Sequence, residues 1–151
     1  MDNVFIEGVG STTFGQHSNR TAVDLAVEAS LNAIEDAKVD LDKIGTVYLG
    51  NFVSGVLTGQ EVLAGLVADK LGISGVPATK VEGACASGGM AFRHACMAVA
   101  SGSCEVALAV GVEKMTHAKT SLVTEALNCA LDHEVDAASG LTYPGLFALV
   151  W

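Results

Sequence analysis

The sequence predicts an α/β fold with a mainly parallel mixed sheet, and three observations lead to this prediction. Short apolar runs alternate with segments of helical periodicity along most of the 151 residues. The run 106–110 is apolar throughout, which indicates a strand covered on both faces. A glycine-rich turn at 83–89 joins another apolar run to a long helix, and it places Cys85 where that helix begins.

The first elements are a strand and a helix. Residues 4–9 are apolar and precede a polar, glycine-bearing stretch, so we expect a strand followed by a loop. Apolar residues recur at helical spacing over 22–37. Thr21 with Asp24 three residues later is a capping-box signal, which predicts that the helix starts directly after Thr21.

The next elements lead toward the cysteine. We expect a second strand at 46–50 and a loop over 51–59. Apolar spacing predicts a helix over 60–71, with Gly72 placed to end it in a left-handed conformation. A third strand is expected at 78–82, directly before the cysteine turn.

The helix that carries Cys85 at its start is expected to continue to about Ser101. It consists mostly of small residues and contains the adjacent Gly88 and Gly89, each of which costs about 1 kcal/mol relative to alanine inside a helix. We therefore expect neighbouring backbone to approach the helix closely at these glycines. Because the helix is apolar on nearly all sides, we also expect it to be the buried central helix of the fold.

The chain divides into two parts by composition. Residues 1–112 hold the strand–helix alternation and are expected to form an α/β domain core. Residues 113–151 are more polar, with short helices predicted at 122–131 and from about Thr142, and we expect them to begin a loop domain. The last helix stops after barely two turns, so we expect the chain to be a truncated, N-terminal portion of a longer protein.

Composition excludes several classes of function. Half of the residues are hydrophobic and only 17% are charged, which predicts a large buried fraction or an apolar face that needs a partner. A net charge of −9 argues against nucleic-acid binding, and no apolar run approaches the ~18 residues of a membrane span. Four cysteines without a Cys-x-x-Cys pair signal no zinc site, so we expect no metal and reduced thiols in the cytoplasm.

Two stretches, Glu82–Gly89 and Val106–Met115, with the helix between them, resemble the thiolase family. The branch most similar to them is that of the archaeal and sterol-carrier-protein-type thiolases, and Gly8-Val9-Gly10, Gly50-Asn51 and Gly59-Gln60 follow the same pattern. The resemblance extends over essentially the whole chain but only over the N-terminal half of a thiolase. It implies a thiolase-like N-terminal half as the fold.

The resemblance also implies an activity. Thiolases make or break a carbon–carbon bond beside a β-keto carbonyl in acyl-CoA thioesters, and Cys85 corresponds to the nucleophile that takes the acyl group. The helix dipole favours a thiolate there, and the backbone N–H of Cys85 is placed to donate to the oxyanion. The resemblance puts the loop of Met115 near the pocket, so Met115 is a candidate substrate-binding residue.

The sequence departs from the family in one respect. Thiolases use a histidine and a second cysteine, in a Cys-x-Gly motif, to move protons, and neither matching motif occurs here. All four histidines, His17, His94, His117 and His133, lie outside any such motif. Two alternatives to an acyltransferase therefore stay open: a non-catalytic thiolase-like subunit of a heteromer, and a condensing enzyme of the ketoacyl-synthase kind.

The resemblance implies coenzyme A as a substrate, in lipid metabolism, and no bound cofactor. It implies a homodimer or tetramer, and this branch also allows a small zinc-ribbon/OB-fold companion protein. A peroxisomal location is the alternative to the cytoplasm if the source is eukaryotic. Because thiolases sandwich the cysteine helix between two sheets, we expect these residues alone to leave an apolar face exposed and to form no stable monomer.

Overall fold

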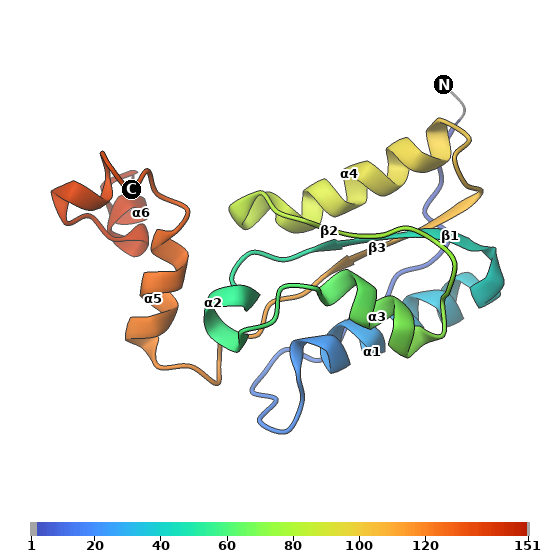
Figure 1. The fold of residues 1–151 in the computed structure, drawn as a ribbon, viewed down its shortest axis with the longest axis horizontal. Coiled ribbons are helices and arrows are strands. Elements are labelled where there is room, and N and C mark those ends of the chain that lie inside the picture. Colours follow the sequence, from blue (N-terminus) through green and yellow to red (C-terminus); the bar gives the residue numbers. More distant parts are fainter. Residues whose placement is uncertain (1–2, 151) are drawn as a thin grey trace.

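A computed structural model describes residues 3–150 and shows one parallel sheet between two helical layers (Figure 1). The strand order is β2-β1-β3, and both pairings are parallel. Helices α1 and α3 cover one face of the sheet and α4 covers the other (Figure 1). The predicted α/β class and its parallel sheet are confirmed. These elements are α1 (Ala22–Ala37), β1 (Ile44–Gly50), α3 (Leu63–Leu71), β2 (Ala78–Val81), α4 (Ser87–Ala100) and β3 (Val106–Gly111).

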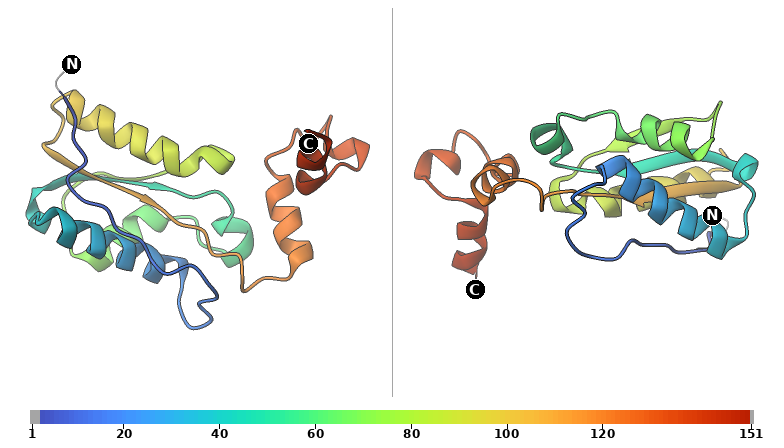
Figure 2. Two further views of the ribbon diagram at one scale, coloured as in Figure 1. Left: turned by 180° about the vertical axis from the view of Figure 1, so that it is seen from behind. Right: turned by 90° about the horizontal axis from the view of Figure 1, so that it is seen from below.

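The remaining helices lie outside these layers. A short helix α2 follows β1, and α5, the turn η3 and α6 follow β3 and extend away from the sheet (Figures 1 and 2). The two helices predicted after residue 113 are therefore present. The bounds are η1 (Leu41–Lys43), α2 (Ser54–Thr58), η2 (Ala84–Ala86), α5 (Thr120–Asn128), η3 (Ala137–Ser139) and α6 (Tyr143–Val150).

The core lies between the sheet and the α1/α3 layer. Val47 and Leu49 of β1 and Leu63 and Val67 of α3 are fully buried. β1 is the central strand of the sheet and is buried along most of its length. β3 is an edge strand in which Ala109 is exposed, so the cover on both faces predicted from its apolar run is not found within residues 3–150. This packing fixes the carboxyl ends of the three strands at one edge of the sheet, beside the cysteine.

The start of α1 confirms the predicted capping box. The Asp24 N–H donates to the Thr21 hydroxyl over 3.1 Å, and the Thr21 N–H donates to the Asp24 carboxylate over 2.8 Å. Lys70 of α3 donates to the same carboxylate over 2.7 Å and so links the two helices. The hydrogen bond from Lys70, followed by those from Thr21, holds the pKa of Asp24 well below its usual range. At the end of α3, Gly72 adopts the predicted left-handed conformation.

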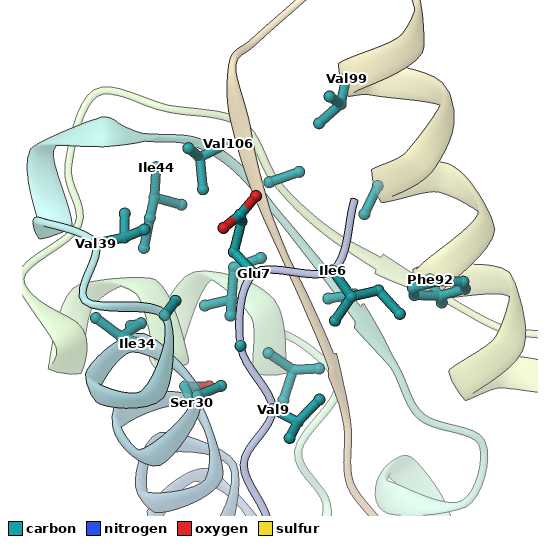
Figure 3. Close-up of a pocket in the computed structure, with 18 of the residues that line it drawn as sticks. Ile6, Glu7, Val9, Ser30, Ile34, Val39, Ile44, Phe92, Val99 and Val106 are labelled. Atoms are coloured by element: carbon teal, nitrogen blue, oxygen red, sulfur yellow. The ribbon is translucent and has the colours of Figure 1, made fainter. Parts of the chain in front are cut away.

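The strand predicted at 4–9 is wrong, because these residues form no ladder with another strand. The segment instead lies against α1, where a Cβ on Gly10 would come within 2.3 Å of the Ala29 carbonyl oxygen. The Val9 N–H donates to the Asp36 carboxylate over 2.9 Å. A groove of about 510 Å³ separates the segment from β3, with Ile6 and Val9 on one side and Val106 on the other (Figure 3).

Three further predictions need correction. The expected loop at 51–59 contains α2, and the helix expected over 60–71 begins only at Leu63. The burial of α4 is one-sided: Ala91 and Ala95 face the sheet and are buried, whereas Phe92 is 47% exposed. The physical reason is that, within residues 3–150, the sheet covers only the inner side of α4 (Figure 1). No helix within residues 3–150 is both long and apolar enough to cross a membrane.

Candidate active site

Cys85 does not lie within α4 but in the three-residue turn η2, between β2 and the start of that helix. Its side chain is exposed. Ala84, directly before it, has φ +49°, a left-handed conformation that residues with a Cβ seldom adopt. Such strained backbone is found at functional sites when the surroundings enforce it. The turn therefore exposes the thiol, and neighbouring residues must stabilise the strained conformation of Ala84.

Ser87 holds this turn. Its hydroxyl accepts a hydrogen bond from the Gly83 N–H over 3.0 Å and donates one to the Ala84 carbonyl over 2.7 Å. The Ala86 N–H also donates to the Gly83 carbonyl over 2.9 Å. Ser87 is buried, so both of its bonds are protected from water. The Ser87 side chain thus links the two residues before Cys85 to the first residue of α4.

The close backbone approach predicted at Gly88 and Gly89 is wrong, because the glycine that permits close packing here is Gly50 of β1. A Cβ on either glycine would meet nothing within 4 Å. A Cβ on Gly50, the last residue of β1, would instead lie 2.3 Å from the Ser87 carbonyl oxygen and 2.6 Å from the Gly88 nitrogen. The strand end therefore presses against the first turn of α4 because Gly50 has no side chain. Gly88 lines the same cavity as Cys85.

A cavity of about 350 Å³ opens at the carboxyl ends of β1 and β3. Cys85 and Met115 both line it, so the structure brings together the two residues that the sequence singled out. Phe52 and Leu127 supply further apolar surface, and Glu113 supplies a carboxylate. A cavity with mostly apolar walls and few polar groups beside a thiol suits a small acyl group.

Glu113 and Asn51 connect the two loops that border this cavity. The Glu113 carboxylate accepts hydrogen bonds from the N–H groups of Phe52, over 2.5 Å, and Val53, over 3.4 Å. Asn51, which is 1% exposed, donates to the Val112 carbonyl over 2.8 Å. Burial of its carboxylate raises the pKa of Glu113, and the bonds from Phe52 and Val53 oppose that shift. No sequence motif singles out either polar side chain.

Tyr143, at the start of α6, forms a side-chain hydrogen bond with Cys85. Its phenol oxygen lies 2.8 Å from the Cys85 sulfur. The hydrogen bond with Cys85 raises the pKa of Tyr143, so the phenol keeps its proton. Sequence reasoning assigned Tyr143 only to a helix start, and no local motif marks a contact between residues 58 positions apart.

Three of the four histidines form hydrogen bonds to backbone carbonyl groups rather than to the thiol. His17 bonds to the Thr13 carbonyl over 2.8 Å, His94 to the Met90 carbonyl over 2.7 Å and His117 to the Leu57 carbonyl over 3.1 Å. Each ring is thus engaged with backbone. Among residues 3–150, none of these three histidines is placed to take a proton from Cys85.

The fold and this site define a class of protein: a parallel α/β domain that presents a cysteine before a central helix, over an acyl-sized cavity. The profile described as "Thiolase, N-terminal domain" matches residues 4–149. The chain belongs to the thiolase family.

The relatives agree with this assignment. Acetyl-CoA acetyltransferase of Methanocaldococcus jannaschii is 43% identical over 150 residues, which are 99% of this chain and 38% of that protein. Human sterol carrier protein 2 is 30% identical over 139 residues, 90% of this chain and 25% of that protein. The archaeal and sterol-carrier-protein-type resemblance is thus confirmed, and the chain spans less than two fifths of the length of these relatives.

Solved structures support the fold. Acat5 thiolase from Ascaris suum, in complex with coenzyme A, superposes with a TM-score of 0.63 at 20% identity, over 74% of this chain and 29% of that one. At this level of identity the likeness concerns the fold alone. It confirms the architecture predicted for a thiolase-like N-terminal half.

Proposed function

We propose that this chain is part of a thiolase-type acyltransferase, in which Cys85 takes the acyl group from an acyl-CoA thioester. The observation that carries the proposal is the position of the thiol: exposed, on a strained turn, at the mouth of a mostly apolar cavity. The similarity to acetyl-CoA acetyltransferases supports an acetyl or acetoacetyl group as the substrate portion.

The proposed chemistry uses two transfers. The Cys85 thiolate attacks the thioester carbonyl carbon, and collapse of the tetrahedral oxyanion expels the thiolate of coenzyme A. In condensation, the acyl group then passes to a carbon nucleophile. In cleavage, the Cys85 thiolate attacks the β-keto carbonyl carbon instead, the bond between the α- and β-carbons breaks, and the carbanion released takes up a proton to give the shortened acyl-CoA. The acyl group left on Cys85 then passes to coenzyme A. The backbone N–H of Cys85 is proposed as one oxyanion donor, and Met115 is proposed to contact the acyl chain. Coenzyme A acts as a substrate, and these steps call for no bound cofactor.

The proton-moving groups of the family, a histidine and a second cysteine, are proposed to come from residues outside this sequence. We also propose a homo-oligomeric state and a cytoplasmic location. Exposed apolar side chains on the outer side of α4, Phe92 and Met97, support burial of that side in an assembly. The zinc-ribbon/OB-fold companion stays a prediction from the resemblance.

The experiment that tests the function uses the full protein that carries this sequence. Cleavage of acetoacetyl-CoA by coenzyme A is measured for the wild type, Cys85→Ala and Cys129→Ala. Cys129 is a matched control because it is also a free, exposed cysteine. We expect Cys85→Ala to lose activity by several orders of magnitude and Cys129→Ala to keep it. Activity that survives in Cys85→Ala would contradict the proposal. An inactive wild type would favour the non-catalytic subunit.

A further inference from the structure

We propose that Tyr143 is a catalytic residue of this site: its phenol donates a hydrogen bond to the Cys85 thiolate and stabilises it as both nucleophile and leaving group. The inference rests on the proposed role of Cys85 and adds a group to its reaction. The phenol oxygen lies 2.8 Å from the sulfur. A phenol O–H is a donor, and an ionised sulfur is an acceptor, so the contact takes this direction when the thiol is ionised.

The position of Tyr143 is fixed from two sides. Its backbone N–H donates to the Asn128 side-chain oxygen, at the end of α5, over 2.7 Å. Its ring packs edge-on against Phe147, one turn later in α6, with ring centroids 5.2 Å apart and an interplanar angle of 70°. Edge-to-face pairs of this kind restrict ring orientation. The phenol is therefore held toward the thiol by the segment that follows β3.

The hydrogen bond from Tyr143 changes in opposite ways in the two transfers: it weakens in the first and strengthens in the second. When the thiolate attacks, a carbon–sulfur bond forms to Cys85, the carbonyl electron pair moves to oxygen, and the bond to the sulfur of coenzyme A then breaks. The sulfur of the resulting thioester is a weak acceptor, so the phenol loses its ionic partner. In the second transfer, Cys85 leaves as a thiolate and regains the hydrogen bond. A donor that stabilises a thiolate lowers its nucleophilicity only partly and improves it as a leaving group.

The test measures how fast iodoacetamide alkylates Cys85 as a function of pH, in the full protein, by mass mapping of the peptide that contains Cys85. Tyr143→Phe removes only the hydroxyl. Tyr48→Phe is the matched control, because the chain has two tyrosines and the ring of Tyr48 packs against His94 in the α/β layers. Three charged groups lie near the turn, and both variants keep them: Glu82 accepts from the Ala84 N–H, Glu113 lines the cavity, and Lys80 acts electrostatically on Glu113.

We expect the pH of half-maximal alkylation to rise by about one unit in Tyr143→Phe, the size of a lost hydrogen bond to a charged group, and to stay unchanged in Tyr48→Phe. An unchanged profile in Tyr143→Phe would overturn the inference. If Tyr143→Phe fails to fold, 3-fluorotyrosine at position 143 replaces it. Because its more acidic phenol is a stronger hydrogen-bond donor, 3-fluorotyrosine is expected to lower the pH of half-maximal alkylation. An unchanged pH of half-maximal alkylation would again overturn the inference.

A different result would refute the proposed function. If acetyl-CoA leaves no acyl group on Cys85 in the wild type, Cys85 is not the nucleophile, whatever the alkylation profile shows. If the acyl group forms and the two tyrosine variants behave alike, only the role of Tyr143 is lost. We also expect Tyr143→Phe to slow transfer from acylated Cys85 to coenzyme A more than it slows acylation. Equal slowing of both steps would contradict the leaving-group role.

Discussion

Substitution of Gly50 by alanine tests how closely the sheet and the cysteine turn are coupled. Gly50 has an ordinary strand conformation, so alanine adds steric contact without backbone strain. The new Cβ would lie 2.3 Å from the Ser87 carbonyl oxygen and 2.6 Å from the Gly88 nitrogen. Close carbon–oxygen contacts in proteins are about 3.3 Å or longer, so the strand end and α4 must separate by about 1 Å.

The loss of unfolding free energy in Gly50→Ala depends on which atoms must move to make room for the new Cβ. The two atoms that the new Cβ would meet belong to the backbone of Ser87 and Gly88 rather than to a flexible side chain. We therefore expect the upper part of the overpacking range, about 3 kcal/mol of unfolding free energy. Ser87 also holds the turn of Cys85, so the displacement reaches the thiol. A 1 Å misplacement costs about 10²-fold in rate, and we expect acyl transfer in Gly50→Ala to fall by that order.

The assay combines denaturant unfolding with steady-state acyl transfer by the full protein. Gly111→Ala is the matched control, because Gly111 pairs with Gly50 in the β1–β3 register and its Cβ would meet only the Gly88 Cα, at 3.7 Å. We expect Gly111→Ala to change stability by less than about 0.5 kcal/mol. Gly50→Ala that behaves like Gly111→Ala would refute the coupling between the strand end and the turn.

Three groups, Asp24, Glu113 and Cys104, give further predictions. Asp24→Asn is expected to lower the unfolding free energy at pH 7. Because the pKa of Asp24 is depressed in the folded protein, its stabilisation depends on ionisation, so the difference from wild type should shrink as pH falls below the ordinary Asp pKa of about 3.9. Denaturant titrations across pH test this, and a difference that stays constant down to pH 2 would contradict it. Glu113→Ala should cost about 1–3 kcal/mol by leaving two N–H groups without an acceptor. Because the pKa of Glu113 is raised, the wild type should lose unfolding free energy relative to Glu113→Gln as pH rises through about 4.3 and above, and parallel curves would count against the burial of the carboxylate. Burial raises the pKa of Cys104, so mass mapping at neutral pH should show Cys104 alkylated more slowly than the exposed Cys85, and equal rates would contradict this.

Local signals were sufficient for most of the fold. Thr21 and Asp24 fixed the start of α1 because a capping box is formed within four residues. Gly72 ended α3 for an equally local reason. The segment 4–9 was predicted wrongly because its apolar character resembles a strand, whereas a strand also needs a partner to receive its backbone hydrogen bonds. A groove lies between these residues and β3 in the structure (Figure 3).

The candidate site was predictable only where a motif carried it. Cys85 and Met115 stand in family-like stretches, and the structure places both at one cavity. The ties that shape the site join distant parts of the chain. Glu113 reaches Phe52, Gly50 touches Ser87, and Tyr143 reaches Cys85 across 58 residues. Periodicity and spacing report on neighbours along the sequence, so contacts of this range require the folded structure.

The role of Cys85 as acyl acceptor is the central claim, and one measurement tests it most directly. The full protein is incubated with acetyl-CoA, quenched in acid, digested and analysed by peptide mass spectrometry. We predict one acetyl group, on the peptide that contains Cys85, and its removal when free coenzyme A is added before the quench. An acetyl group on the Cys129 peptide instead, or no acetylated peptide from a folded protein, would contradict the account.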